Sequence, residues 1–176
     1  ITPYIKPNGR QKIVLSVKDG TNFSSQPRGK QQIKPSGIYY TPVSGIWQTV
    51  WLEAVSNEAH LQEVKTTSNI DEKTVTVIPI ANQALVSGYS IRTSVFFNGE
   101  KIAFGEGKPN IPLTLKIDTP QLWSPDNPNL YDLKLILVNP SGAVIDQVDS
   151  YFGMRKISLG DHKGVKYLFL NNRPLF

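Results

Sequence analysis

The sequence predicts an all-β protein whose central part is a β-sandwich, and three observations lead to this prediction. Apolar residues alternate with polar ones in almost every patterned stretch, which is the period of a strand with one buried face. No long window shows a 3.6-residue period, because Gly or Pro, 13 of each in 176 residues, interrupts most candidate helices. Turn residues separate seven strand-length stretches between about residues 55 and 152, a spacing typical of a sandwich.

The first segment of the chain contains two expected strands and a long polar loop. Residues 13–17 alternate between apolar and polar side chains, and residues 19–36 follow as the loop. Residues 46–55 form the second expected strand, in which Trp47 and Trp51 share one face while apolar residues also occupy the other. We therefore expect this strand to be covered on both faces.

The middle segment contains the seven strands of the expected sandwich. Asn98-Gly99 supplies the two positive φ angles of a two-residue hairpin turn, and residues 139–142 turn the chain again. Because each expected strand has one apolar face, two facing sheets would bury them together. The expected strands are residues 61–67, 74–80, 89–97, 101–104, 111–117, 133–137 and 143–151.

Charge divides the chain into three segments and excludes some partners. Residues 1–52 carry seven Lys/Arg against one acidic residue, residues 53–153 carry seven against twelve, and residues 154–176 carry five against one. The basic residues of the first segment are scattered without interleaved aromatic residues, which favours a solvated face over a nucleic-acid surface. The longest apolar stretch is far shorter than the ~20 residues of a membrane-spanning helix, so we expect no nucleic-acid and no membrane partner.

The sequence contains no motif for a catalytic nucleophile or for a metal site. The chain has no cysteine, which excludes a disulfide, a thiol nucleophile and a Cys-based zinc site. His60 and His162 lie far apart in polar turns, without a G-x-S-x-G or H-E-x-x-H motif beside them. Residues 105–108 (GEGK) lack the spacing of a phosphate-binding loop. We therefore predict no metal site and no cofactor within this segment.

Acid–base hydrolysis would require two carboxylates in contrasting environments. Asp71, Glu72, Asp146 and Asp149 lie in turns or on the polar side of strands, where charge is ordinarily solvated. None has the apolar surroundings that would raise one pKa and leave another low. We therefore predict no catalytic residue in the chain.

Four stretches, in order, resemble the motifs of glycoside hydrolase family 2, which contains β-galactosidases, β-glucuronidases and β-mannosidases. Residues 44–52 (SGIWQTVWL) resemble the end of the sugar-binding jelly roll of that family. Residues 122–131 (LWSPDNPNLY) are similar to its L-W-s-P-e-x-P-x-L-Y motif. Residues 152–157 (FGMRKI) match F-G-x-R-x-I, and residues 169–175 (FLNNRPL) match f-L-N-G-k-P-l.

The resemblance implies a layout that agrees with the charge segments. Residues 1–54 would be the C-terminal part of a jelly-roll (galactose-binding-like) domain, residues 55–153 an immunoglobulin-like β-sandwich, and residues 154–176 a linker and the start of a (β/α)₈ barrel. In the family, the barrel holds both catalytic glutamates of a retaining double displacement, and neither would fall within this chain. Apolar faces in residues 1–54 would then lack partners, so we expect dimerisation or poor order there.

Two departures from the family pattern qualify the resemblance. Gln48 stands where many relatives have Arg. Asn172 stands where Gly is usual, and Asn is the residue that tolerates the left-handed conformation best after Gly. Residues 37–42 contain none of the acidic residues that contact sugar in some β-galactosidases. The resemblance leaves Arg28, in the loop of residues 26–31, together with Tyr39 and Tyr40, as candidate substrate-binding residues near the mouth of the barrel.

The resulting interpretation is a non-catalytic β-domain fragment of a bacterial retaining exo-β-glycosidase, with β-galactosidase preferred. A β-mannosidase or β-glucuronidase fragment is one alternative. A free-standing carbohydrate-binding module, with Trp47, Trp51 or Trp123 stacking on sugar rings, is another. The expected partners are carbohydrate and the catalytic barrel of the same enzyme, with a homo-oligomer allowed. The sequence leaves a periplasmic and a cytoplasmic location equally open.

Overall fold

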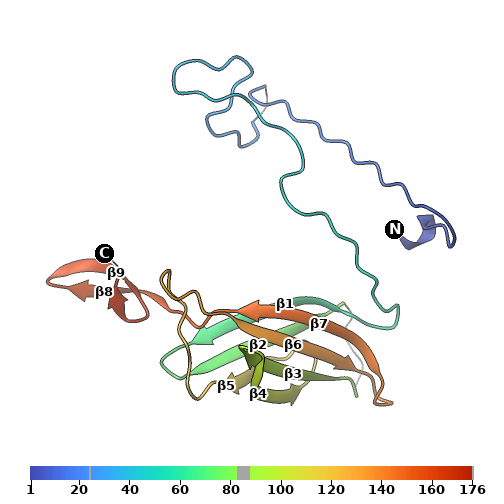
Figure 1. The fold of residues 1–176 in the computed structure, drawn as a ribbon, viewed down its shortest axis with the longest axis vertical. Coiled ribbons are helices and arrows are strands. Elements are labelled where there is room, and N and C mark those ends of the chain that lie inside the picture. Colours follow the sequence, from blue (N-terminus) through green and yellow to red (C-terminus); the bar gives the residue numbers. More distant parts are fainter. Residues whose placement is uncertain (24, 83–87, 176) are drawn as a thin grey trace. The chain divides into compact units, whose positions relative to one another are not determined.

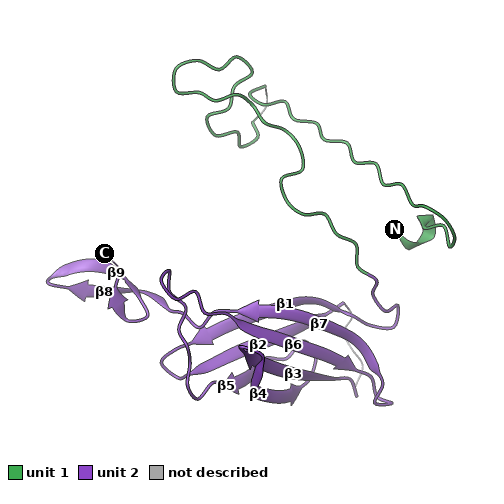
Figure 2. Cartoon of the chain, in the orientation of Figure 1, with its two compact units in different colours: residues 1–53 green, residues 54–176 purple. Residues whose placement is uncertain are grey.

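The computed structural model describes residues 1–23, 25–82 and 88–175 and is built almost wholly from antiparallel strands. Ser24, in the expected polar loop, and Phe176, at the end of the expected third segment, lie outside the described residues. The chain divides into two compact units, residues 1–53 and 54–176 (Figure 2). Its one described helix is a single 3₁₀ turn, Thr2–Tyr4. In the described part of the chain, no helix is long and apolar enough to cross a membrane.

The second unit contains a two-sheet sandwich (Figure 1). One sheet has the strand order β1-β2-β5 and the other β4-β3-β6-β7, with every pairing antiparallel. All seven strands expected from the alternating pattern are present, and the all-β prediction is confirmed. The strands are β1 Leu61–Asn69, β2 Thr74–Ala81, β3 Ser90–Phe97, β4 Glu100–Gly107, β5 Leu113–Lys116, β6 Tyr131–Val138 and β7 Val144–Phe152.

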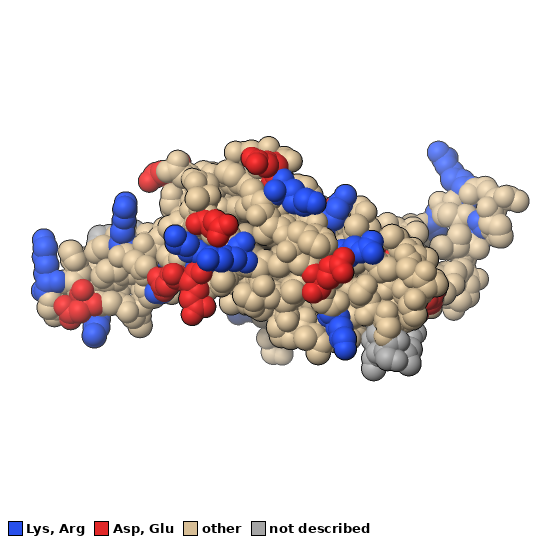
Figure 3. Space-filling view, turned by 90° about the horizontal axis from the view of Figure 1, so that it is seen from below, with Lys and Arg blue, Asp and Glu red and all other residues tan. Residues whose placement is uncertain are grey.

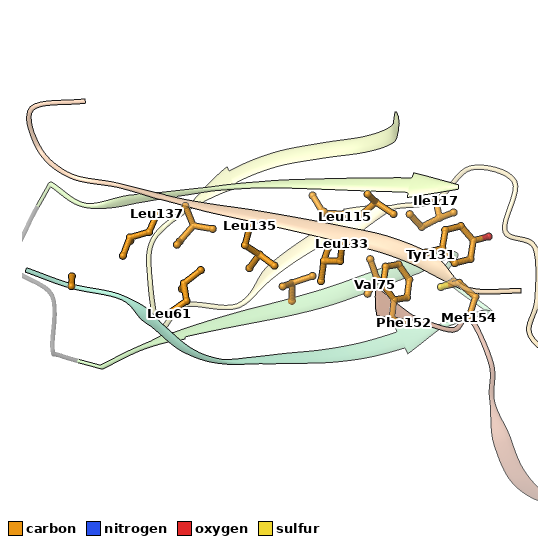
Figure 4. Close-up of a cluster of buried hydrophobic side chains, with 14 residues drawn as sticks. Leu61, Val75, Leu115, Ile117, Tyr131, Leu133, Leu135, Leu137, Phe152 and Met154 are labelled. Carbon is orange, nitrogen blue, oxygen red and sulfur yellow. The ribbon is translucent and has the colours of Figure 1, made fainter. Parts of the chain in front are cut away.

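The core lies between the two sheets, as Figure 4 shows. Leu133, Leu135 and Leu137 of β6 point inward as alternate residues, because successive side chains of a strand face opposite sides of the sheet. Val75 and Val77 of β2 face them from the opposite sheet and are fully buried. The alternation that predicted the strands therefore also selects the residues of the core.

An aromatic stack fills one end of this core. The Tyr131 ring lies between those of Phe97 and Phe152, with centroid distances of 4.9 and 5.1 Å. The Tyr131 hydroxyl accepts a hydrogen bond from the Gln121 backbone N–H at 2.6 Å and lies 3.2 Å from the Gln121 carbonyl oxygen. A buried phenol is thus satisfied by the backbone of the loop that precedes β6.

The expected hairpin turn at residues 98–99 is also confirmed. Asn98 has φ 52° and Gly99 has φ 82°, so both central residues take the positive φ that a tight hairpin with matching strand twist requires. The turn joins β3 directly to β4, and the two strands pair from Phe97↔Glu100 onward.

A third sheet, made of three strands, follows the two sheets of the sandwich. Its order is β10-β9-β8, with β8 Ile157–His162, β9 Val165–Leu170 and β10 Arg173–Pro174. The family resemblance predicted a linker and the start of a barrel for residues 154–176, and no strand was expected there, because Lys163-Gly164 is a weak hairpin signal. The turn nevertheless takes positive φ at both positions, 56° and 81°.

The first unit lacks the two strands expected in it. Residues 13–17 and 46–55 form no strand, and the prediction that residues 46–55 are covered on both faces is wrong. Trp47 is 86% exposed and Trp51 72% exposed. A strand requires a hydrogen-bonded neighbour, and the described residues of this unit supply only one isolated bridge, Gln31↔Tyr40. The apolar residues of the unit are correspondingly exposed.

Figure 3 shows acidic and basic side chains interspersed over the face in view. Such mixing of both signs is typical of a solvated protein surface.

Candidate functional site

Three of the four sequence motifs meet in space at one place, where the third sheet, β10-β9-β8, joins the sandwich. We call this place the joint and define it by Trp123, Gly153, Arg155 and Asn171. The Trp123 backbone N–H donates to the Met154 carbonyl at 2.9 Å, and Leu122 pairs with Met154 in a parallel bridge. Residues 122–131 and 152–157 are thereby held side by side.

The Trp123 side chain lies at the centre of the contacts in the joint. The guanidinium carbon of Arg155 lies 4.9 Å from the ring centroid, a cation–π distance. A Cβ placed on Gly153 would lie 3.3 Å from the Trp123 Cβ, closer than side chains ordinarily pack. The Ser68 hydroxyl at the end of β1 donates to the Gly153 carbonyl at 2.9 Å. The motif glycine therefore allows the close approach of Trp123, and the motif arginine covers its ring.

Asn171 links the third motif to the other two. Its side-chain N–H donates to the Trp123 carbonyl at 2.9 Å, and its side-chain oxygen accepts from the Lys156 backbone N–H at 3.0 Å. Its own backbone N–H donates to the Lys156 carbonyl at 2.8 Å. Asn171 and Asn172 have φ of 52° and 65°, so Asn172 takes the left-handed conformation expected of it.

Asp71, expected only as a solvated turn residue, is the acidic partner next to the joint. Its two carboxylate oxygens accept from Lys156 Nζ and from the Asn172 side-chain amide, the latter at 2.9 Å. These hydrogen bonds, with the Lys156 one dominant, lower the pKa of Asp71 below its ordinary value. Sequence reasoning missed this role because the partners lie 85 and 101 residues away.

The joint has no arrangement suited to acid–base catalysis. A hollow of about 620 Å³ opens beside Trp123 and Arg155, and its described lining includes Thr66, Ser68 and Tyr151 but no Asp, Glu or His. Across the described ranges, no group of three or more His, Cys, Asp and Glu comes together in the manner of a metal site. The geometry of the joint instead fixes backbone segments relative to one another.

The predicted substrate-binding residues lie in the first unit. The Tyr40 backbone N–H donates to the Lys30 carbonyl at 2.9 Å, and the Gln32 N–H donates to the Tyr40 carbonyl at 3.1 Å. These bonds place the segment of Tyr39 and Tyr40 beside the loop that carries Arg28. The Arg28 guanidinium donates to the Asn22 carbonyl at 2.9 Å. Sugar contact by these three residues stays a prediction.

Asp19 is the residue of this unit that sequence reasoning missed. Its carboxylate accepts hydrogen bonds from the Ser44 hydroxyl at 2.7 Å, the Thr21 backbone N–H at 2.7 Å and the Gln26 side-chain amide. Donation by Ser44, followed by Thr21, lowers the pKa of Asp19. Only an Asp-Gly turn signal at residues 19–20 marked this position in the sequence.

Comparisons with known proteins agree with the motifs. The sequence model of Glycosyl hydrolases family 2 matches residues 49–155. A Formosa agariphila protein to which beta-glucuronidase activity is ascribed is 32% identical over 96% of this chain and 20% of its own length. The beta-galactosidase of Thermoanaerobacter pseudethanolicus is 24% identical over 99% of this chain and 23% of its own length. The chain thus spans about a fifth of the length of these relatives.

Solved structures show the same fold. The β-glucuronidase from Ruminococcus gnavus in complex with D-glucuronic acid superposes with a TM-score of 0.54 at 19% identity. The match covers 68% of this chain and 19% of that protein.

Proposed function

This chain belongs to glycosyl hydrolases family 2, and on that premise we propose that it is the non-catalytic β-segment of a retaining exo-β-glycosidase. In this proposal the segment holds a separate catalytic domain in place and contributes to the shape of its pocket. The observation that carries the proposal is the joint, where three motifs converge on contacts between backbone segments and not on an acid–base pair.

The exposed surface of the third sheet, β10-β9-β8, supports a scaffold role. Ile157 and Leu159 of β8 lie opposite Leu170 and Leu168 of β9 and share one face. Ile157, Leu159 and Leu168 are 58%, 76% and 46% exposed. Three exposed aliphatic side chains on a sheet fixed to the sandwich form a surface suited to packing against another domain. We propose that the catalytic barrel of the same enzyme covers it.

The substrate that we propose is a terminal β-galactoside or β-glucuronide. Relatives named for each activity match nearly the whole chain, so the two sugars have equal support. Arg28 is the proposed residue that would distinguish them, since a guanidinium can pair with the carboxylate of a glucuronide and has no such partner on a galactoside. Tyr39 and Tyr40 would supply ring surface for either sugar.

The test compares the 176-residue chain with a complete family 2 polypeptide that contains it. Both are assayed with 4-nitrophenyl β-D-galactoside and 4-nitrophenyl β-D-glucuronide, and the anomeric form of the first product is followed by NMR. We expect turnover with retention by the complete polypeptide and none by the chain. Turnover by the chain alone, inversion, or no turnover of either substrate by the complete polypeptide would contradict the proposal.

A second candidate function is carbohydrate binding by the first unit alone. The exposure of Trp47 and Trp51 favours it, because exposed indole rings stack on sugar faces. Saccharide titration followed by tryptophan fluorescence distinguishes the two functions. A saturable change that is lost in Trp47→Ala supports the binding module, and an unchanged spectrum supports the scaffold.

A further inference from the structure

Three side chains at the base of the β8–β9 hairpin form a cluster that we call the clasp: Asp71, Lys156 and Asn172. Asp71 lies in the turn between β1 and β2 of the sandwich. Lys156 immediately precedes β8, and Asn172 follows β9. One carboxylate therefore contacts both ends of the hairpin, one through each oxygen.

A side chain of β1 holds the backbone of the turn that carries Asp71. The side-chain oxygen of Asn69 accepts from the backbone N–H groups of Asp71 and Glu72 at 3.1 and 3.0 Å. This is an Asx-type turn, in which a side chain fixes the backbone that follows it. The carboxylate of Asp71 therefore projects from a preorganised turn.

The hairpin is attached to the sandwich at a second point. Asn171 donates to the Trp123 carbonyl, and Trp123 precedes β6. An attachment at one point leaves a hairpin free to swing, whereas two attachments from different loops fix its angle. The clasp supplies the first attachment and the joint the second.

Asn172 has a role that its backbone conformation does not explain. A glycine, usual at this place in the motif, would adopt the observed φ of 65° more readily than Asn. Glycine could not donate to Asp71, as the Asn172 amide does at 2.9 Å. The amide and the ammonium of Lys156 are thus matched to the two oxygens of one carboxylate.

We propose that Asp71 is a positioning residue whose carboxylate fixes the orientation of the β8–β9–β10 sheet on the sandwich. It thereby fixes where the apolar face of Ile157, Leu159 and Leu168 is presented. The value of this orientation to an enzyme rests on the function proposed above, whereas the orientation itself is a property of this chain.

The experiment measures residual dipolar couplings and amide hydrogen exchange on the ¹⁵N-labelled 176-residue chain. In the parent chain, we expect the amides of β8–β9 and of the sandwich to fit one alignment tensor. In Asp71→Ala, the hairpin couplings should no longer fit the sandwich tensor. Exchange at the Lys156 and Asn171 amides should rise about twofold to fivefold, the range for an exposed ion pair. Asn172→Gly should give couplings and exchange rates between those of the parent chain and those of Asp71→Ala. It removes one of the two side chains that contact the Asp71 carboxylate and keeps the positive φ.

Glu72→Gln is the matched control, because among the described residues the Glu72 carboxylate has no ion pair or side-chain hydrogen bond. Unchanged couplings and exchange in a folded Asp71→Ala, or an equal change in Glu72→Gln, would overturn the proposal. If Asp71→Ala does not fold, the Asn172→Gly variant provides the test. Unchanged couplings in that variant would overturn the proposal. No step measures hydrolysis, so failure here is separate from failure of the proposed function.

Discussion

Ser44 donates a hydrogen bond from its hydroxyl to the Asp19 carboxylate at 2.7 Å, across 25 residues of chain. Ser44 opens the Ser-Gly-Ile motif, which has no acidic residue in the positions just before it. Asp19 brings a carboxylate to the motif from 25 residues earlier in the chain. Because residues 19–44 include Arg28, Tyr39 and Tyr40, the contact between Asp19 and Ser44 closes the base of the segment that holds all three predicted substrate-binding residues.

Asp19→Ala is expected to loosen this loop. The substitution removes the acceptor of the Ser44, Thr21 and Gln26 donors together. Hydrogen exchange at the Thr21 amide should accelerate, while amides of the sandwich should not change. Asp161→Ala, which removes the acceptor of the Gly164 N–H in the turn after β8 of the other unit, is the control and should leave Thr21 unaffected.

The same contact predicts a pH dependence. The pKa of Asp19 is lowered in the folded loop, so its stabilising effect is present above the unfolded pKa of ~3.9 and is lost as pH falls through the lower folded value. Protection of the Thr21 amide, corrected for intrinsic exchange, should therefore fall below about pH 4 in the parent chain. A pH-independent protection factor down to pH 2 would show that the carboxylate does not hold the loop.

Tyr131→Phe should destabilise the sandwich by about 1 kcal/mol, the usual worth of a hydrogen bond, because it leaves the Gln121 N–H without its acceptor. Burial raises the pKa of Tyr131. Its contribution is therefore complete below the unfolded pKa of ~10 and is lost as pH rises through the higher folded value. Urea unfolding at pH 7 and pH 10.5 measures both effects. Tyr151→Phe, at a position 67% exposed, is the control, and an equal loss there would contradict the assignment.

The sandwich could be predicted from the sequence because strands with one buried face alternate apolar and polar residues with a period of two. Leu133, Leu135 and Leu137 are both the pattern that predicts β6 and the residues of the core. This period carries no information about polar pairs that are distant in sequence. Asp71 was therefore predicted to be a solvated turn residue, and Asp19 only the first residue of a polar loop. The alternating pattern also predicted a strand at residues 13–17 that the structure lacks. Alternation determines which side chains share a face, but it does not supply the neighbouring strand that completes the hydrogen bonds.

Asp146→Ala should weaken the edge where β7 meets β1. The Asp146 carboxylate accepts from the Leu61 backbone N–H at 2.8 Å, across 85 residues, at the first residue of β1. Removing this acceptor leaves a partly buried N–H unpaired, and we expect a loss of about 1 kcal/mol in urea unfolding. Asp149→Ala on the outer face of the same strand should change stability by less than half as much. Equal losses would mean that charge, and not the Leu61 contact, is responsible.

Gly105→Ala should destabilise the sandwich by about 1–3 kcal/mol, the range for overpacking a core. A Cβ at this position would lie 2.5 Å from Leu115 Cδ2, and Leu115 is only 5% exposed, so its side chain has little room to move. Gly107→Ala, two residues along the same strand, meets Leu113 at an ordinary 3.7 Å and is the matched control. It should be neutral or slightly stabilising, because alanine has less freedom than glycine to lose on folding. Both variants are compared by urea unfolding, and a Gly105→Ala protein as stable as Gly107→Ala would mean that β4 and β5 lie farther apart than the structure places them.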